Sequence, residues 1–437
     1  MRNPRNPLFW NMDFAAFGAA ILLAVIGILS IFSSGVTADG NIISNDYMKQ
    51  VMWAAVGLAL MITLVFIDYR QIKDYSLGLY LLFVVILVYT KLFGRVVNGA
   101  RAWIGVGELG IQPSEFTKVI VILFLARYLD NSEHEPVLRR IIVAFSIVAL
   151  PMVLVLSQPD FGTALVFLPI LFFMLVVAGI ETRYLLFLAV AGSLTMGFTI
   201  LPLWEKYILA KPSSFLFVFY REPYDLLVLL VIAIIAAIAS WGFISFKKRY
   251  YYWISWISIA LSVGMGFSLL AHKVLKEYQV MRLIVFLDPS IDPRGSGWNI
   301  LQSITAIGSG GFSGRGFLLG PQSHNKYIPQ QSTDFIFSIV AEEWGFLGGV
   351  LVFGLFWLLL SRCVAIMRTA RDSFSRYVTG GIMGMIFFHF MINAGMAMGI
   401  MPITGIPLFF LSYGGSSLLT VMMAVGILLG ISARRYQ

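Results

Sequence analysis

Long apolar segments recur along the whole chain, and they restrict its fold more than any other feature of the sequence. A run of about 18 or more apolar residues is long enough to cross the hydrocarbon core of a bilayer as a helix. Such a helix satisfies its own backbone polar groups without water. We predict twelve spans, which lie near residues 14–33, 50–67, 75–93, 114–129, 139–157, 161–179, 184–203, 225–246, 252–271, 334–360, 378–400 and 413–431.

The composition indicates the same class of protein. Hydrophobic residues make up 59% of the chain and charged residues 12%, and the mean hydropathy is +0.86. A soluble domain carries about 25% charged residues, so the soluble classes are excluded. The single cysteine, Cys363, excludes an intramolecular disulfide framework. We therefore predict an all-α, polytopic helical membrane protein in which residues 1–437 form one membrane domain.

The net charge of +9 reflects membrane topology rather than binding to nucleic acid. Basic clusters such as Lys247–Arg249 and Arg434–Arg435 fall in short segments that are cytoplasmic if the N-terminus is cytoplasmic. Short loops rich in Lys and Arg remain on the cytoplasmic side. We expect both termini there, and we expect the first apolar run to stay as an uncleaved anchor because it is too long for a signal peptide.

Two polar segments on the outer side are long enough to carry chemistry, residues 96–119 and the large loop 272–333. The first ends in "QPSEFTK", where Pro113 suits the start of a helix and Glu115 the first turn. Glu115 and Lys118 share one helical face. They form either an ion pair that lets both charges enter a span or the lining of a polar cavity, and the two readings are compatible. Asp160 either caps the next span or has a functional role in supporting the site.

Three acids accompany the span near 334–360, in "TDFIFSIVAEEWGF". On a continuous helix Glu342 lies about 12 Å along the axis from Asp334 and about 80° around it, and Glu343 lies on the opposite face. Paired glycosidase carboxylates lie about 5–9.5 Å apart, so these acids form no such pair within one helix. Asp334 is either a helix cap or a lone base, and Glu342 and Glu343 must point into the bundle or meet cations.

The remaining outer segments give weaker signals. "IGSGGFSGRG" fits no nucleotide-binding pattern; a backbone phosphate nest is one reading, and a flexible loop is favoured. Arg282 and Arg315 could meet an anionic headgroup. The segment 401–417, "MPITGIPLFFLSYGGSS", contains Ser412 and Tyr413 and indicates a broken or re-entrant segment. The four histidines show no metal-ligand spacing and are interpreted as incidental, and "NAGMAMGIM" as packing.

Five motifs occur in order: "NGARAWIGVGELGIQPSEFTK", "QPDFGTA", "DPRGSGWNILQSITAIGSGGFSGRG", "YIPQQSTDFIFSIVAEEWGFLGG" and "PITGIPLFFLSYGGSS". On these motifs the chain resembles the SEDS (shape, elongation, division, sporulation) proteins of bacteria, and it is closer to the RodA branch than to the FtsW branch. The family has ten spans. The two further spans predicted here would be a helix pair inserted within 206–271, which leaves the loop 272–333 extracellular.

The resemblance implies a peptidoglycan glycosyltransferase that polymerises lipid II on the outer face of the bacterial cytoplasmic membrane during cell elongation and shape maintenance. It implies a class B penicillin-binding protein as partner, besides lipid II and membrane lipid. The family's essential acid falls on Asp334, and its acid and lysine fall on Glu115 and Lys118. Arg101 matches less well, because this chain reads "GARAW" where the family pattern has no alanine before the tryptophan.

The implied reaction suits a single base. A sugar hydroxyl attacks an anomeric carbon whose leaving group is a lipid-linked pyrophosphate, and Asp334 would remove the hydroxyl proton. The α-linked donor and β-linked product imply inversion. Positive charge for the leaving group would come from Mg²⁺ or Mn²⁺ or from residues such as Lys118 and Arg101. The candidate substrate-binding or supporting residues are Glu115, Lys118, Arg101, Asp160, Arg282, Arg315, Glu342, Glu343, Ser412 and Tyr413. The alternatives are a lipid II flippase, a division-type enzyme and a non-catalytic scaffold.

Overall fold

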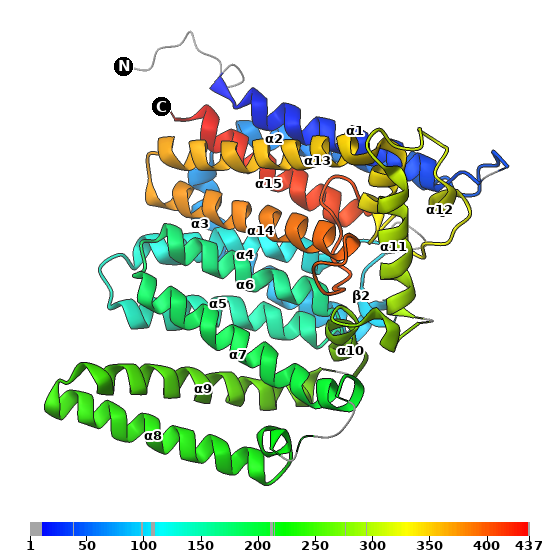
Figure 1. The fold of residues 1–437 in the computed structure, drawn as a ribbon. Coiled ribbons are helices and arrows are strands. Elements are labelled where there is room, and N and C mark those ends of the chain that lie inside the picture. Colours follow the sequence, from blue (N-terminus) through cyan, green and yellow to red (C-terminus); the bar gives the residue numbers. More distant parts are fainter. Residues whose placement is uncertain are drawn as a thin grey trace, which may run out of the picture. The chain divides into compact units, whose positions relative to one another are not determined.

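The computed structural model describes residues 11–37, 39–97, 99–105, 110–209, 213, 215–275, 277–293 and 295–435 (Figure 1). Apart from one short hairpin, its regular structure in the described residues is helical. The chain divides into two compact units, one made of Met1–Gly179 and Trp298–Gln437 and the other of Ile180–Gly297.

The larger unit holds most of the helices. Its elements are α1 (Phe14–Ser34), α2 (Asp46–Phe66), α3 (Tyr69–Phe93), β1 (Arg95–Val97), β2 (Ala100–Trp103), α4 (Pro113–Asn131), α5 (Val137–Leu156), α6 (Phe161–Val177), most of α11 (Ser296–Gly310), α12 (Pro321–His324), α13 (Ile336–Thr369), α14 (Ser373–Ala397) and α15 (Gly415–Ala433). In the most apolar window of α15 94% of the residues are buried, and in that of α14 78%, whereas α2 and α3 bury 22%. The helices α14 and α15 therefore form the centre of this unit together with α4, most of whose residues are buried. The helices α2 and α3 present an apolar face to lipid.

The smaller unit contains α7 (Thr182–Tyr207), the 3₁₀ turn η2 (Leu216–Phe219), α8 (Tyr224–Phe246), α9 (Arg249–Val274), α10 (Glu277–Val285) and η3 (Pro289–Ile291). The helices α8 and α9 pack against each other, and α9 packs on α7. The helices α8 and α9 are joined at Lys247, whose φ of 51° ends α8 in a left-handed turn. The predicted helix pair thus forms, and its status as an insert stays a prediction.

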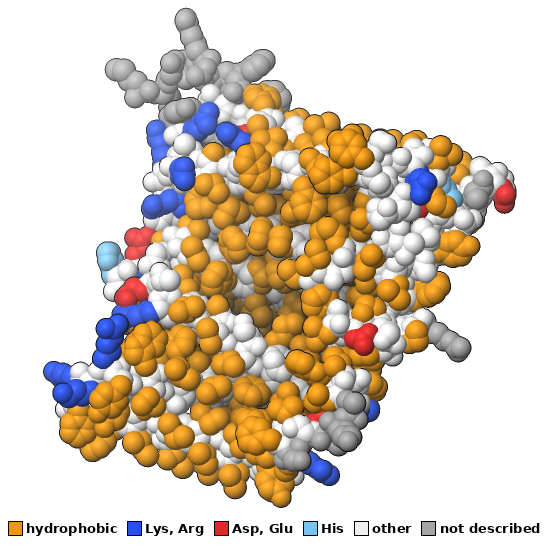
Figure 2. Space-filling model, viewed as in Figure 1, with side chains coloured by type: hydrophobic (Ala, Val, Ile, Leu, Met, Phe, Trp, Pro, Cys, Tyr) orange, Lys and Arg blue, Asp and Glu red, His pale blue; other side chains and the backbone are white. Residues whose placement is uncertain are grey.

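Among the described residues, ten helices are long and apolar enough to cross a membrane. They are α1, α2, α3, α5, α7, α8, α9, α13, α14 and α15. The other two predicted spans also fold as helices and fall short for physical reasons: α6 has 17 residues, and α4 carries four charged side chains. The chain is a polytopic helical membrane protein. Figure 2 shows the apolar surface over α13 and α14. Lys and Arg side chains gather on the side of the larger unit where its C-terminus lies.

The large loop 272–333 is mostly structured rather than extended. It contains the end of α9 and the elements α10, η3, α11 and α12. The helix α11 lies across the ends of α13 and α14 (Figure 1), because the Ser303 hydroxyl donates to the Ala397 carbonyl at 2.6 Å and pairs with Ser338 at 2.6 Å. The helix α11 therefore covers one end of the larger unit.

Two expectations about this end of the molecule were wrong. The span near 334 is not one continuous helix, because α13 begins at Ile336 and breaks at Gly345, which has φ 64° and ψ −158°. The glycine-rich segment is neither a phosphate nest nor a flexible loop. Its backbone pairs with the broken helix: Arg315 N donates to Glu342 O at 3.0 Å, and Phe346 N donates to Gly311 O at 2.9 Å. A Cβ at Gly310 or Gly314 would lie 2.0 Å from the carbonyl oxygen of Ala341 or Glu343, so these two glycines are needed for the close backbone contact.

Replacing Gly314 by Ala is expected to destabilise the fold. Gly314 has φ 84°, and a Cβ there would lie 2.0 Å from the Glu343 carbonyl oxygen. Overpacking and the left-handed backbone together should cost about 2–4 kcal/mol in the free energy of unfolding. Unfolding in mixed detergent micelles would measure the loss.

The control is Gly311→Ala, since Gly311 has φ 58° and a Cβ added there would meet no atom within 4 Å. It reports the backbone strain alone, about 1 kcal/mol. Equal losses in the two variants would show that the contact between Gly314 and α13 does not matter for stability.

Candidate functional site

Asp334 lies in the turn that precedes α13 and is half-buried. The N-cap of α13 is Phe335, so Asp334 is not the cap of this helix. Its backbone is held on both sides: its amide donates to Gln330 O at 3.1 Å, and its carbonyl accepts from Asn393 Nδ2 of α14 at 2.8 Å. The structure thus fixes the main chain of Asp334 independently of its carboxylate.

The segment between α14 and α15 is a buried, non-helical coil (residues 401–414), as the sequence predicted. Ser412 Oγ donates to Thr333 O at 2.5 Å and accepts from Leu408 N at 2.8 Å. The amide of Tyr413 donates to Ser332 O at 2.8 Å. The predicted residues Ser412 and Tyr413 therefore attach this coil to the turn that carries Asp334.

Glu115 and Lys118 form a buried ion pair in the first turns of α4. Their side chains are 3% and 0% exposed, and Lys118 Nζ lies 2.8 Å from Glu115 Oε1. Lys118 Nζ also lies 3.0 Å from Nε2 of His389, whose Nδ1 lies 2.9 Å from the Pro407 carbonyl oxygen. The His389 ring stacks on Phe409 with centroids 3.6 Å apart. Through His389 the ion pair is attached to the coil 401–414.

Asp160 caps α6, because its carboxylate accepts from Thr163 N at 3.1 Å. It also accepts from the side-chain Nε2 of Gln112 at 2.6 Å, and the backbone amide of Gln112 donates to Ser416 Oγ at 2.9 Å. These contacts tie together the first residues of α4, α6 and α15. Capping by Asp160, one of the two readings of the sequence, is therefore present, and Asp160 also joins a polar cluster with Gln112 and Ser416.

Glu342 and Glu343 are buried in the first half of α13 and hold the preceding loop. Glu342 accepts from the amides of Gln322 and Ser323 at 2.7 and 3.0 Å and from the Ser323 hydroxyl at 2.7 Å. Glu343 lies 3.3 Å from His324 Nε2 and accepts from the Ser33 hydroxyl. Their carboxylates are engaged by α12 and α1, which accounts for two acids inside an apolar span.

The candidate cations differ in accessibility. Arg101 lies exposed on β2, and its Nη1 donates to Leu92 O at 3.2 Å. Arg315 is exposed in the glycine-rich segment. Arg282 is half-buried in α10 of the smaller unit. Lys118, by contrast, is fully buried. The structure therefore joins Asp334, Ser412 and Tyr413 through one coil to Glu115 and Lys118. It links Asp160 through Gln112 to Ser416 of α15, and it leaves Arg101 and Arg315 at the surface.

Sequence reasoning missed His389 and Asn393, which lie on α14 and bind the coil. The interpretation of His389 as incidental was wrong, and Asn393, in a stretch interpreted as packing, makes two hydrogen bonds. The available signal was the presence of a His and an Asn four residues apart inside an apolar span, since polar side chains at that depth require partners.

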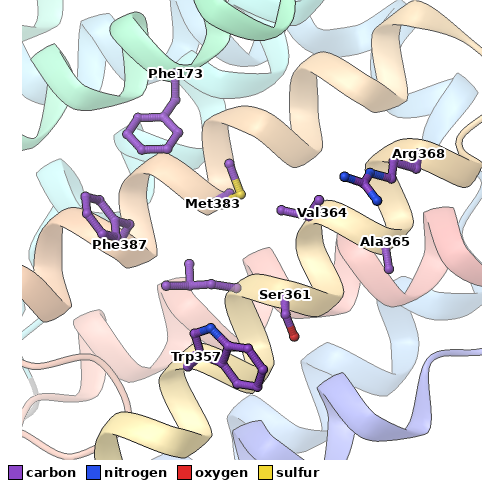
Figure 3. Close-up of a pocket in the computed structure, with 9 residues that line it drawn as sticks. Phe173, Trp357, Ser361, Val364, Ala365, Arg368, Met383 and Phe387 are labelled. Atoms are coloured by element: carbon purple, nitrogen blue, oxygen red, sulfur yellow. The ribbon is translucent and has the colours of Figure 1, made fainter.

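An apolar groove lies on another part of the larger unit (Figure 3). It has a volume of about 520 Å³ and lies between α13 and α14, with Trp357, Phe387 and Phe173 on its walls and Arg368 at one end. None of the predicted site residues is among those that line it. Within the part of the chain that the structure describes, no group of three or more His, Cys, Asp or Glu side chains is arranged to hold a metal ion.

The polytopic helical membrane fold and the five sequence motifs together point to one protein family. The family model described as "Cell cycle protein", which covers FtsW, RodA and SpoVE, matches residues 14–224 and 226–437. The chain belongs to this family.

Relatives of known name cover nearly all of the chain. It is 48% identical over 425 residues to the peptidoglycan glycosyltransferase RodA of Treponema pallidum, covering 97% of this chain and 98% of the relative. It is 30% identical over 435 residues to the peptidoglycan glycosyltransferase MrdB of Escherichia coli K12, with 99% and 97% covered.

Solved structures agree with the fold. A chain of a peptidoglycan synthase complex that coordinates polymerization and crosslinking matches with a TM-score of 0.67 and 28% identity, over 98% of this chain and 99% of that one. The rod shape determining protein RodA of Thermus thermophilus matches with a TM-score of 0.61 and 24% identity, over 99% and 100%, and shows the likeness of fold alone.

Proposed function

We propose that this chain is a peptidoglycan glycosyltransferase that polymerises lipid II during cell elongation and shape maintenance, with Asp334 as the catalytic base. The observation that carries this assignment is the position of Asp334. It is half-buried in a turn whose backbone is fixed from two sides, and Phe335 rather than Asp334 caps α13. The N-cap position of Phe335 supports a role for Asp334 other than capping α13.

In the proposed reaction a hydroxyl of N-acetylglucosamine attacks the anomeric carbon of the donor. The C–O bond to the lipid-linked pyrophosphate breaks as the new glycosidic bond forms, and the hydroxyl proton passes to the Asp334 carboxylate. Attack from the face opposite the leaving group inverts the α-linked donor to a β-linked product. A single base is sufficient for this step, because no covalent intermediate with the enzyme forms.

The leaving pyrophosphate requires positive charge, and the structure divides the candidate cations by accessibility. Arg101 and Arg315 are exposed and suit contact with phosphate oxygens. Lys118 is fully buried between Glu115 and His389, so its role is to organise the site rather than to bind the pyrophosphate. Mg²⁺ is commonly held by one or two carboxylates together with substrate phosphates. Because the residues just named are cations and cannot bind a metal ion, Mg²⁺ or Mn²⁺ would have to be held largely by the substrate pyrophosphate. It would supply charge to the leaving group.

The proposed function also implies the orientation of the chain in the membrane and the identity of its partner protein. The loop 272–333 and the coil 401–414 face the outside of the bacterial cytoplasmic membrane, and both termini are cytoplasmic. The basic residues that follow α13 and α15, Arg371 and Arg434 among them, support this orientation. A cysteine introduced at Arg371, in a Cys363→Ser background, should react with impermeant reagents only from the cytoplasm.

Cross-linking of the glycan requires a class B penicillin-binding protein, and one structural match belongs to a complex that combines the two activities.

The test is glycan-strand formation from purified lipid II by the purified chain together with its penicillin-binding partner. Strands longer than the partner alone produces are expected. Movement of lipid II across vesicles without strand formation would identify a flippase instead. An absence of both activities would identify a scaffold.

A further inference from the structure

Two polar side chains of α14 link the two halves of the candidate site. His389 and Asn393 are four residues apart, so they lie on one face of the helix, and both are fully buried. They bind adjacent carbonyls of the coil 401–414: His389 Nδ1 lies 2.9 Å from Pro407 O, and Asn393 Nδ2 donates to Ile406 O at 2.8 Å. Each side chain therefore holds the same short stretch of coil.

Each of the two also reaches a predicted site residue. His389 Nε2 lies 3.0 Å from Lys118 Nζ, and Asn393 Nδ2 donates to the Asp334 carbonyl at 2.8 Å. The acid and the buried ion pair come from helix starts more than 200 positions apart in the sequence. One helical turn of α14, about 6 Å long, connects them.

The hydrogen-bond chemistry fixes the orientation of both side chains. An ammonium group only donates, so Nε2 of His389 accepts from Lys118, and Nδ1 carries the proton that is donated to Pro407 O. Two carbonyl oxygens face Nδ2 of Asn393, so the amide cannot be reversed. Its Oδ1 is buried without a hydrogen-bond partner in the described part of the chain. The hydrogen bonds of this buried amide are therefore the two that Nδ2 donates, one to the coil and one to the Asp334 turn.

We propose that His389 and Asn393 are positioning residues of the glycosyltransferase, which hold the Asp334 turn and the Glu115–Lys118 pair in a fixed relation through the coil 401–414. This inference rests on the proposed function. A general base must lie within hydrogen-bond reach of the hydroxyl it deprotonates, and a misplacement of about 1 Å can cost about 100-fold in rate. The Asp334 turn is not part of a helix, so its carbonyl contact with Asn393 limits its movement.

The test compares Asn393→Leu and His389→Leu, which remove the hydrogen bonds at similar volume, with the milder Asn393→Ser and His389→Gln. Ser keeps one donor, and Gln keeps an acceptor for Lys118. The controls are Asn131→Leu and His134→Leu, because both of those side chains are exposed. In the complex with its partner, kcat should fall about 10- to 100-fold in the Leu variants and less in the milder ones, while KM for lipid II changes less than about threefold.

A second readout does not depend on activity. Hydrogen–deuterium exchange of the amides of Ser412, Tyr413 and Asp334, which donate to Leu408, Ser332 and Gln330, should become about tenfold faster in the Leu variants. Exchange within α1 and α15 should be unchanged, which shows that the fold is intact. Unchanged exchange at the three amides, or a rise in KM with kcat unchanged, would overturn the proposal. If the wild type formed no glycan, the proposed function would fail, and the exchange would still decide whether the two side chains hold the coil and the Asp334 turn together.

Discussion

Asp334→Asn is expected to lower glycan polymerisation by about 10²–10⁴-fold, the contribution of a positioned general base. The amide has nearly the shape of the carboxylate but cannot accept the hydroxyl proton. The backbone contacts of Asp334 with Gln330 and Asn393 do not involve its carboxylate, so the fold should persist. The measurement is glycan-strand formation from purified lipid II by the variant bound to its penicillin-binding partner.

The matched control for this substitution is Asp39→Asn, in the connection between α1 and α2. Asp39 is exposed and is expected to face the same side of the membrane. Its replacement should leave the rate within a factor of about two. Undiminished polymer from a folded, partner-bound Asp334→Asn variant would remove Asp334 from the mechanism.

The fold class was predictable because a bilayer imposes a long apolar run on every span. All twelve predicted segments fold as helices, although α4 and α6 fall below the length or hydropathy of the other ten. The charged first turns of α4 can enter the protein because Glu115 and Lys118 neutralise each other there. Composition alone does not report such pairing.

The break in α13 could not be predicted from periodicity. A glycine such as Gly345 lowers helix propensity but does not end a helix by itself. The break depends on a second segment, Gly310–Gly316, that pairs with the exposed backbone. Contacts between segments distant in the chain override local preference in this way. The same contacts explain why the glycine-rich segment is ordered.

The individual polar motifs of the site were visible in the sequence, whereas their connection was not. Asp334, Glu115 and Lys118 stand out because charge is rare in spans. His389 and Asn393 are uncharged, and the sequence does not say which carbonyls they meet. Their role depends on the path of the coil 401–414, which folds back between α14 and α15 so that Ile406 and Pro407 reach one face of α14.

Breaking the buried ion pair is expected to destabilise the protein more than any other single change in α4. Lys118→Met leaves the Glu115 carboxylate, and Glu115→Gln leaves the Lys118 ammonium, without its charged partner in a fully buried place. Each single substitution should lower the free energy of unfolding by about 3–5 kcal/mol. The double variant Glu115→Gln/Lys118→Met removes both charges and should recover most of that loss. Unfolding of the four proteins in mixed micelles gives the coupling energy.

An exposed pair with the same spacing provides the control. Asp46 and Lys49 are also three residues apart at the start of a helix, with an N–O distance of 3.4 Å and side chains about one third exposed. Their cycle should give no more than about 1 kcal/mol. Losses that simply add in the Glu115 and Lys118 cycle would contradict a tightly coupled pair. The double variant could regain stability and still polymerise slowly. The contribution of the Glu115–Lys118 pair to the fold would then be separated from its contribution to the reaction. In that case the pair is required for the geometry that His389 transmits to the coil.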